Sequence, residues 1–241
     1  MNSALQVHIF DTEKEITNFM VEKWKEICDE SIALKGRFSV ALSGGKTPTA
    51  LYRELASARC ALPWGRTHIF LVDERFVPYT HRDSNFGMIS GFLNPAGIPF
   101  ENLHPMPTDG PTPEISADRY EHGLRVFFRQ PQEGIPEFDL VILGLGDDGH
   151  TASLFPGNPA LKESKRLVAV VPEGPVHKRL TLTLPVINKA KSIIFLVLGK
   201  SKAAMLKRVL RGKDTSLPAA LVKPEHGDLL LVADREAASE L

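Results

Sequence analysis

The sequence predicts a single α/β domain, residues 1–241, in which helices cover both faces of a doubly wound, mostly parallel sheet. Three observations predict it. Short apolar runs rich in β-branched residues recur along the chain, segments with helical hydrophobic spacing alternate with them, and no linker-like or low-complexity segment divides the chain. Several of the runs are apolar throughout, as expected for parallel strands buried on both faces.

The elements follow in order along the chain. The expected strands are Val7–Phe10, Phe38–Leu42, His68–Val72, Phe138–Leu143, Leu167–Val171, Leu180–Leu184, Ile193–Leu198 and Leu229–Ala233. The expected helices are Asp11–Leu34, Pro48–Ser57, Ser84–Leu93, Pro113–Phe128 and Ser201–Leu210. Thr12 and Glu15 form a capping box before the first helix, and Gly36 is placed to end it. The proline-rich stretch Asn94–Pro113 is expected to be a surface excursion. The whole pattern is Rossmann-like, and ligands bind such folds beyond the carboxyl ends of the strands.

Composition narrows the function classes. Lys plus Arg and Asp plus Glu number 29 each, so the chain lacks the overall field that would attract nucleic acid or an anionic membrane. The first ten residues lack a signal-peptide pattern, and the longest apolar run, Ile193–Leu198, is too short to span a bilayer. Cys28 lies in a helical pattern and is expected to be a buried thiol. We therefore expect a soluble cytoplasmic protein, a monomer or homodimer, with no nucleic-acid or membrane partner.

A glycine-rich turn follows the strand Phe38–Leu42. Its two glycines let the backbone turn sharply and approach a ligand, and the amides that begin the next helix favour an anion. A plain strand-to-helix turn is the ordinary alternative. A P-loop is disfavoured because Val40 stands where its first glycine is required, and the glycines around the serine do not match an esterase elbow. The turn is predicted to bind a phosphate-sized anion through Ser43, Gly44, Gly45, Lys46 and Thr47.

A second glycine-rich turn, residues 144–150, reads Gly-Leu-Gly-Asp-Asp-Gly-His. Its glycines match dinucleotide-binding spacing, but Asp147 and Asp148 would repel a pyrophosphate, and Pro156 and Gly157 cut short the helix that this motif requires. An imidazole beside a carboxylate at a strand end suits a general base instead. His150 is the candidate base and Asp148 the group that orients it. A surface or hydrogen-bonding role for His150 is the alternative.

Charged residues elsewhere complete the candidate site. Asp73, Glu74 and Arg75 end a buried strand, and Arg75 could stabilise developing negative charge, although such a triplet can simply mark where a strand leaves the core. Among the polar residues that follow, Ser84 is expected to cap a helix and Asn85 to contact substrate together with Asp73. Arg179 and Lys202, each an ordinary surface charge when taken alone, could together complete a phosphate clamp.

These segments, in this order, resemble the 6-phosphogluconolactonase family, which is related to the glucosamine-6-phosphate deaminases. The matching pieces are residues 43–48, 73–75, 84–86, 144–156, 179–181 and 199–202. Deaminases typically carry tyrosine in place of Arg75 and Ile-Ala-Phe-Asn-Glu-Pro in place of residues 151–156, and the sequence follows the lactonase pattern at both places. Lys46 stands where a small hydroxyl residue is common in the family, and it adds a cation beside the expected phosphate loop.

The resemblance implies hydrolysis of 6-phosphoglucono-1,5-lactone in the oxidative pentose phosphate pathway, without a metal or other cofactor. The glycine-rich loop, Arg179 and Lys202 would then hold the substrate phosphate. His150, oriented by Asp148, would activate water, and Arg75 would stabilise the oxyanion. The alternatives are a deaminase on the same scaffold, a non-catalytic sugar-phosphate sensor, and a metal hydrolase in which Asp73, Asp148 and His150 converge.

Overall fold

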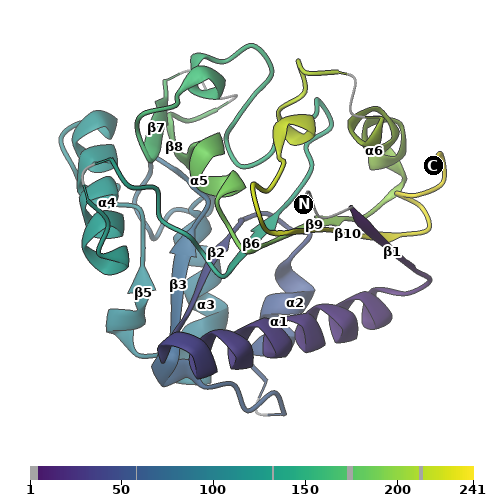
Figure 1. The fold of residues 1–241 in the computed structure, drawn as a ribbon, viewed down its shortest axis with the longest axis horizontal. Helices are drawn as coiled ribbons and strands as arrows, with labels where there is room; N and C mark the ends of the chain where they lie inside the picture. The colour runs from purple at the N-terminus through teal and green to yellow at the C-terminus, as the bar shows by residue number, and fades with distance from the viewer. Residues whose placement is uncertain (1–4, 58, 132, 173–175, 212–213) are drawn as a thin grey trace.

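A seven-stranded sheet, in which each paired neighbour is parallel, forms the centre of the molecule (Figure 1). The computed structural model describes residues 5–57, 59–131, 133–172, 176–211 and 214–241. The strands run in the order β1-β10-β9-β6-β2-β3-β5. Their bounds are β1 Gln6–Phe10, β2 Phe38–Leu42, β3 Thr67–Leu71, β5 Leu103–His104, β6 Leu140–Leu143, β9 Ser192–Val197 and β10 Asp228–Asp234. The predicted doubly wound α/β fold is confirmed.

The order of strands reverses between β2 and β6, which are neighbours in the sheet. From β2 the chain adds β3 and β5 toward one edge, then returns to β6 and adds β9 and β10 toward the other. Loops that leave two such strands diverge to opposite sides, and a crevice forms between them at the carboxyl ends. The two glycine-rich turns follow β2 and β6, so the topology brings them to this one place.

A separate three-stranded antiparallel sheet is the main correction to the predicted fold. It has the order β4-β8-β7, with β4 at Asp73–Arg75, β7 at Val168–Val171 and β8 at Arg179–Leu182. The strand character of β7 and β8 is confirmed, but both lie outside the main sheet, because apolar runs do not reveal which strand is the partner. The run predicted to end at Leu184 stops at Leu182, since Thr183 and Pro185 begin the short helix α5 (Leu184–Asn188).

The helices cover both faces of the sheet. Helices α1 (Glu13–Lys35), α2 (Thr49–Leu55) and α3 (Asn85–Leu93) lie below it in Figure 1, while α5, α6 (Ala203–Leu210) and the small sheet lie above. Helix α4 (Pro113–Phe128) packs against β7. The capping box of α1 is present, Gly36 ends the helix with φ of 78°, and the Ser84 hydroxyl caps α3. None of the helices in the described ranges is long and apolar enough to cross a membrane.

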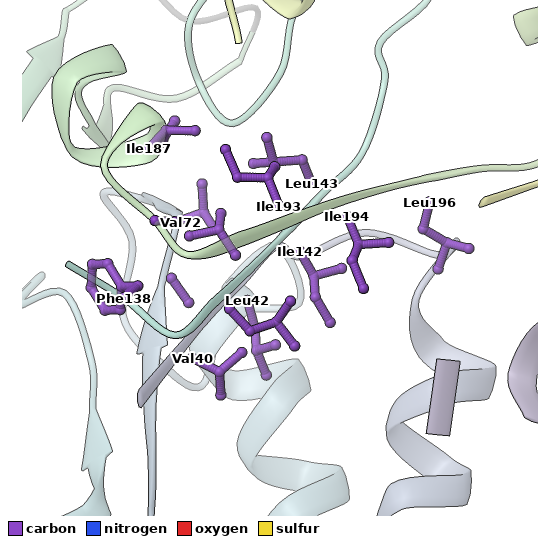
Figure 2. Close-up of a cluster of buried hydrophobic side chains, with 14 of the residues drawn as sticks. Val40, Leu42, Val72, Phe138, Ile142, Leu143, Ile187, Ile193, Ile194 and Leu196 are labelled. Atoms are coloured by element: carbon purple, nitrogen blue, oxygen red, sulfur yellow. The ribbon is translucent and has the colours of Figure 1, made fainter. Parts of the chain in front are cut away.

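Apolar side chains of the central strands form the core. Figure 2 shows Val40 and Leu42 of β2, Ile142 and Leu143 of β6, and Ile193, Ile194 and Leu196 of β9 gathered in one cluster. Cys28 is fully buried, as predicted, and burial raises the pKa of its thiol to about 11. The stretch 94–113 was predicted to be a surface excursion, but it contributes β5 to the sheet and buries Met106 completely, so part of it belongs to the core.

Candidate active site

A cavity of about 260 Å³ opens at the carboxyl ends of β2, β6 and β9, where the strand order reverses. Ten of the residues predicted to form the site line it: Ser43, Gly44, Gly45, Thr47, Asp73, Arg75, Asn85, His150, Arg179 and Lys202. Asp148 is absent from the lining, but its carboxylate contacts the ring of His150, which is part of the lining. Lys46, also predicted to bind phosphate, has an exposed side chain and is likewise absent from the lining.

The loop after β2 is anchored at its first residue. The hydroxyl of Ser43 donates to the carbonyl of Ile142 at 2.8 Å, and the buried hydroxyl of Tyr52 donates to the carbonyl of Ser43 at 2.7 Å. Gly45 has φ of +91°, which a residue with a side chain rarely adopts, and a Cβ on Gly44 would lie 1.8 Å from Oδ1 of Asn85. The two glycines therefore permit the turn and allow Asn85 to approach the loop closely.

The loop after β6 presents an imidazole oriented by a carboxylate. Nδ1 of His150 lies 2.6 Å from Oδ1 of Asp148, which also accepts from the backbone amide of His150 at 3.0 Å. Burial opposes ionisation of Asp148, but these hydrogen bonds and the nearby imidazole outweigh it and lower the pKa of Asp148. Because an ionised carboxylate only accepts hydrogen bonds, the proton of the neutral ring lies on Nδ1. Nε2 then carries the free lone pair, as a general base requires.

The alternating pleat of β4 separates two adjacent carboxylates. Asp73 lines the cavity, where its carboxylate accepts from the hydroxyl of Ser153 and, at 3.3 Å, from Nδ2 of Asn85. Glu74 points to the opposite side, is fully buried, and accepts from the amides of Arg75 and Asn85 at 2.7 and 2.8 Å. It also accepts from the hydroxyl of Ser84 at 3.0 Å and the amide of Phe86 at 2.8 Å. Glu74 thus holds the start of α3, and Asp73 is the carboxylate that can meet a ligand.

Two arginines stand side by side on the cavity wall. Arg75 of β4 is paired directly with Arg179 of β8 in the antiparallel register, and both line the cavity. Nη1 of Arg75 donates to the carbonyl of Asp83 at 2.8 Å, while Nε of each arginine is buried without a hydrogen-bond partner among the described residues. Burial and the charge of Arg75 lower the pKa of Arg179. The carboxylate of Asp73, which lies 3.9 Å from Nη1 of Arg179, has the opposite effect on this pKa. Two cations with unused donors favour an anionic ligand.

A third cation, Lys202, also lines the cavity. Nζ of Lys202, just before α6, is 2.6 Å from Oδ1 of Asp147, whose side chain is 75 % exposed. Sequence reasoning did not assign a role to Asp147, nor to Ser153, which holds Asp73, nor to Phe155, whose ring contacts those of His150 and, through a cation–π interaction, Arg179. All three lie within the motif 144–156, and each has a partner far away in the sequence: Lys202 for Asp147, Asp73 for Ser153 and Arg179 for Phe155. That motif was therefore the signal that could have identified them.

The fold and the cavity define an α/β protein that places an oriented imidazole and an anion site in one pocket. The chain matches the family described as glucosamine-6-phosphate isomerases/6-phosphogluconolactonase over residues 11–231, and it belongs to this family. It is 44% identical over 215 residues to the 6-phosphogluconolactonase of Synechocystis sp., with 88% of each chain covered.

Solved structures agree with this assignment. The 6-phosphogluconolactonase of Thermotoga maritima superposes with a TM-score of 0.83 at 33% identity, covering 95% of this chain and 100% of the other. A monomeric glucosamine-6-phosphate deaminase gives a TM-score of 0.80 at 23% identity, covering 98% of this chain and 100% of the other, so it shares the fold. Fold alone therefore does not separate the two activities of the family, and the residues in the cavity must do so.

Proposed function

We propose that the protein hydrolyses 6-phospho-D-glucono-1,5-lactone to 6-phospho-D-gluconate, a step of the oxidative pentose phosphate pathway. The observation that carries the proposal is His150, held by Asp148 at 2.6 Å, in a cavity that is also lined by Arg75, Arg179 and Lys202. The names of the relatives at 44% and 33% identity support the same activity.

The phosphate of the substrate would bind at the cationic side of the cavity. Arg179 and Lys202 supply charge, and the loop Gly44–Thr47 supplies backbone donors. Burial of Arg179 strengthens its attraction for a dianion, because the low local dielectric screens the charge less. Binding energy gathered at the phosphate, away from the reacting carbonyl, then fixes the sugar ring against the imidazole.

Hydrolysis would take place at His150. Nε2 removes a proton from a water molecule as its oxygen attacks the lactone carbonyl, and Asp148 stabilises the imidazolium that forms. Arg75 stabilises the negative charge on the carbonyl oxygen of the tetrahedral intermediate. When the bond from carbonyl carbon to ring oxygen breaks, the imidazolium returns its proton to that oxygen. The products are a hydroxyl group and a carboxylic acid, which ionises in water.

The glucosamine-6-phosphate deaminase activity of the same family is the outcome to exclude. The cavity contains the buried carboxylate of Asp73, and Arg75 adds a cation. That cation suits the oxyanion that forms during lactone hydrolysis. The test is an assay of the purified protein with lactone generated in situ, in which acid release is measured above spontaneous hydrolysis, and of glucosamine-6-phosphate, in which ammonia is measured. Acid release without ammonia supports the proposal, whereas ammonia release without lactone hydrolysis contradicts it.

The His150→Ala variant tests the assignment of the base. Loss of a general base lowers kcat by roughly 10²–10⁴-fold, while the phosphate contacts and hence KM should change little. His226→Ala is the matched control, because His226 is exposed and lies outside the cavity lining. Near-normal turnover by His150→Ala would remove His150 from the mechanism. Equal turnover of 6-phosphogluconolactone and unphosphorylated gluconolactone by the parent protein would show that the proposed phosphate site does not contribute to catalysis.

A further inference from the structure

Two loops lie side by side just outside the cavity, where the chain leaves β4 and enters β8. The antiparallel pairing of Arg75 with Arg179 continues through a hydrogen bond of 2.8 Å from the amide of Phe76 to the carbonyl of Lys178. Two turns follow in the first loop. The amide of residue 81 donates to the carbonyl of residue 78, and the amide of residue 84 donates to the carbonyl of residue 81. The backbone thus places residues 81 and 83 opposite residue 177.

Three side chains with metal-binding atoms converge between these loops. Oδ2 of Asp83 lies 3.0 Å from Nε2 of His177 and 3.8 Å from Nδ1 of His81. The ligand atoms of the three residues all lie within 4.8 Å of one another. A tetrahedral zinc ion, with bonds of about 2.0–2.1 Å, needs ligand atoms roughly 3.3 Å apart. Small side-chain rotations would therefore bring all three into bonding distance.

We propose that His81, Asp83 and His177 form a binding site for a divalent transition-metal ion of the zinc class. Two imidazole nitrogens and one carboxylate oxygen are ligands that such ions prefer, whereas magnesium and calcium prefer oxygen alone. The side chains are 39%, 38% and 24% exposed, in that order, so water can reach the ion and complete its coordination.

Protonation in the metal-free state is compatible with this site. Nδ1 of His81 accepts from the amide of Asp83 at 3.1 Å, so this nitrogen carries a lone pair, and that hydrogen bond must break when Nδ1 binds a metal ion. Nε2 of His177 faces a carboxylate and carries a proton, which must move to Nδ1 or leave when the metal binds. Arg82 is the opposing charge, 3.9 Å from Oδ1 of Asp83. Its side chain is 90% exposed and can turn into solvent.

The proposed metal site is separate from the cavity but is joined to it by one residue. None of its three ligands belongs to the cavity lining. The carbonyl of Asp83, however, accepts from Nη1 of Arg75, which does line the cavity. An ion bound here would therefore tie the loop that supports Arg75 to the start of β8. The inference does not depend on the proposed lactonase activity.

Zinc binding to the purified full-length protein tests this proposal. Zn²⁺ is titrated in competition with a chromophoric chelator, and His81→Ala and His177→Ala are each expected to weaken the affinity by about tenfold or more, since loss of even an outer-shell partner costs about that much. Arg82→Gln is the control from the same loop, because it removes a charge but no ligand. That variant should bind zinc at least as tightly as the parent protein.

Thermal unfolding supplies a second measurement that does not use activity. Because the ion joins two loops of the folded state only, Zn²⁺ should raise the Tm of the parent protein and of Arg82→Gln, but not that of a variant lacking both His81 and His177. Circular dichroism checks that the variants are folded. Unchanged zinc affinity in the two single variants, or no binding by the parent protein at millimolar zinc, would overturn the proposal.

Discussion

The missing side chain of Gly146 decides where the imidazole of His150 can lie. A Cβ at Gly146 would lie 2.1 Å from Nδ1 of His150 and 2.2 Å from its Cε1, far inside contact distance. The amide of Gly146 also donates to the carbonyl of His150 at 2.8 Å, which closes the loop and holds the ring against the glycine. The glycine spacing that resembles a dinucleotide-binding motif therefore serves close packing of an imidazole.

Gly146→Ala should displace the imidazole from Asp148 and lower kcat by about 10²-fold or more, as misplacement of a general base does. Gly123→Ala in α4 is the control, because a Cβ there would meet no heavy atom within 4 Å and Gly123 lies outside the cavity lining. Steady-state measurement of kcat and KM for the lactone checks this. Wild-type kcat in Gly146→Ala would show that the observed position of the ring is not needed for turnover.

Lys202 and Lys200 allow the phosphate clamp to be tested with two neighbouring lysines. Lys202 lines the cavity and pairs with the exposed Asp147, whereas Lys200 is exposed and outside the lining. Because Asp147 is 75% exposed, its ion pair with Lys202 contributes only about 1 kcal/mol, so a phosphate dianion can displace Asp147.

Lys202→Ala should raise KM by about 10–100-fold with a smaller effect on kcat, since a charge-assisted hydrogen bond contributes about 1.5–3 kcal/mol. Lys200→Ala should leave both constants within about twofold, because a surface charge there contributes little. Initial rates over a range of lactone concentrations separate the two constants. Equal KM values for the two variants would argue against a role for Lys202.

At the scale of elements, β4 serves both the cavity and the start of α3. Its alternation directs Asp73 and Arg75 into the cavity and Glu74 against the first amides of α3. Burial raises the pKa of Glu74, and the hydrogen bonds from Phe86, Asn85 and Arg75 oppose this. A buried carboxylate with four donors around it acts as a structural bridge between strand and helix.

Glu74→Gln should reduce the free energy of unfolding by about 2–4 kcal/mol. In the variant an NH₂ group, which can only donate, replaces one of the two carboxylate oxygens that accept these hydrogen bonds. Urea unfolding followed by circular dichroism measures this change. Glu133→Gln, at an exposed acid, is the control and should stay within about 0.5 kcal/mol of the parent protein. A similar small change in Glu74→Gln would mean that α3 does not depend on this carboxylate.

Elements with strong local signals could be predicted from the sequence, and those without them could not. The capping box at Thr12 and Glu15 and the positive φ of Gly36 are local, so the bounds of α1 agree within two residues. Strand β4 consists of three charged residues and has no apolar pattern. Its strand conformation comes from pairing with β8, more than a hundred residues later, which no local pattern encodes.

At the scale of the whole molecule, the strand order explains why the predicted site residues converge. Turns after β2 and β6 meet because these strands are neighbours where the order reverses. The alternation of strands and helices predicted that these turns lie at the carboxyl ends of the strands, but it did not predict which strands are neighbours. It could not predict that Lys46 would face solvent, that Asp73 rather than Glu74 would face the cavity, or that Asp147 would pair with Lys202. Those outcomes depend on side-chain direction and on contacts between distant segments.

Histidines at the far edge of the sheet affect the acid stability of the whole fold. Nδ1 of His68 in β3 lies 3.2 Å from Nε2 of His104 in β5, and the His104 ring stacks on Phe70 with centroids 4.2 Å apart. Burial, with a smaller effect from His68, lowers the pKa of His104 from 6.5 to about 4. Burial and the charge of Arg37 also lower the pKa of His68.

This shift makes the folded state less stable in acid. Between pH 6.5 and about 4 the unfolded chain takes up a proton at His104 that the folded chain does not, so stability is complete above that range and falls as the pH decreases through it. His104 should therefore lower the free energy of unfolding by about 1–2 kcal/mol at pH 5 relative to pH 7, after allowance for screening of its partly exposed ring.

His104→Gln keeps a hydrogen-bonding side chain that does not titrate. The free energy of unfolding that this variant loses between pH 7 and pH 5 should therefore be smaller by that amount. Urea unfolding at the two pH values measures the difference, with His226→Gln, at an exposed histidine, as the control. If His104→Gln and the parent protein lose the same stability between pH 7 and pH 5, the buried pair does not set the acid limit of the fold.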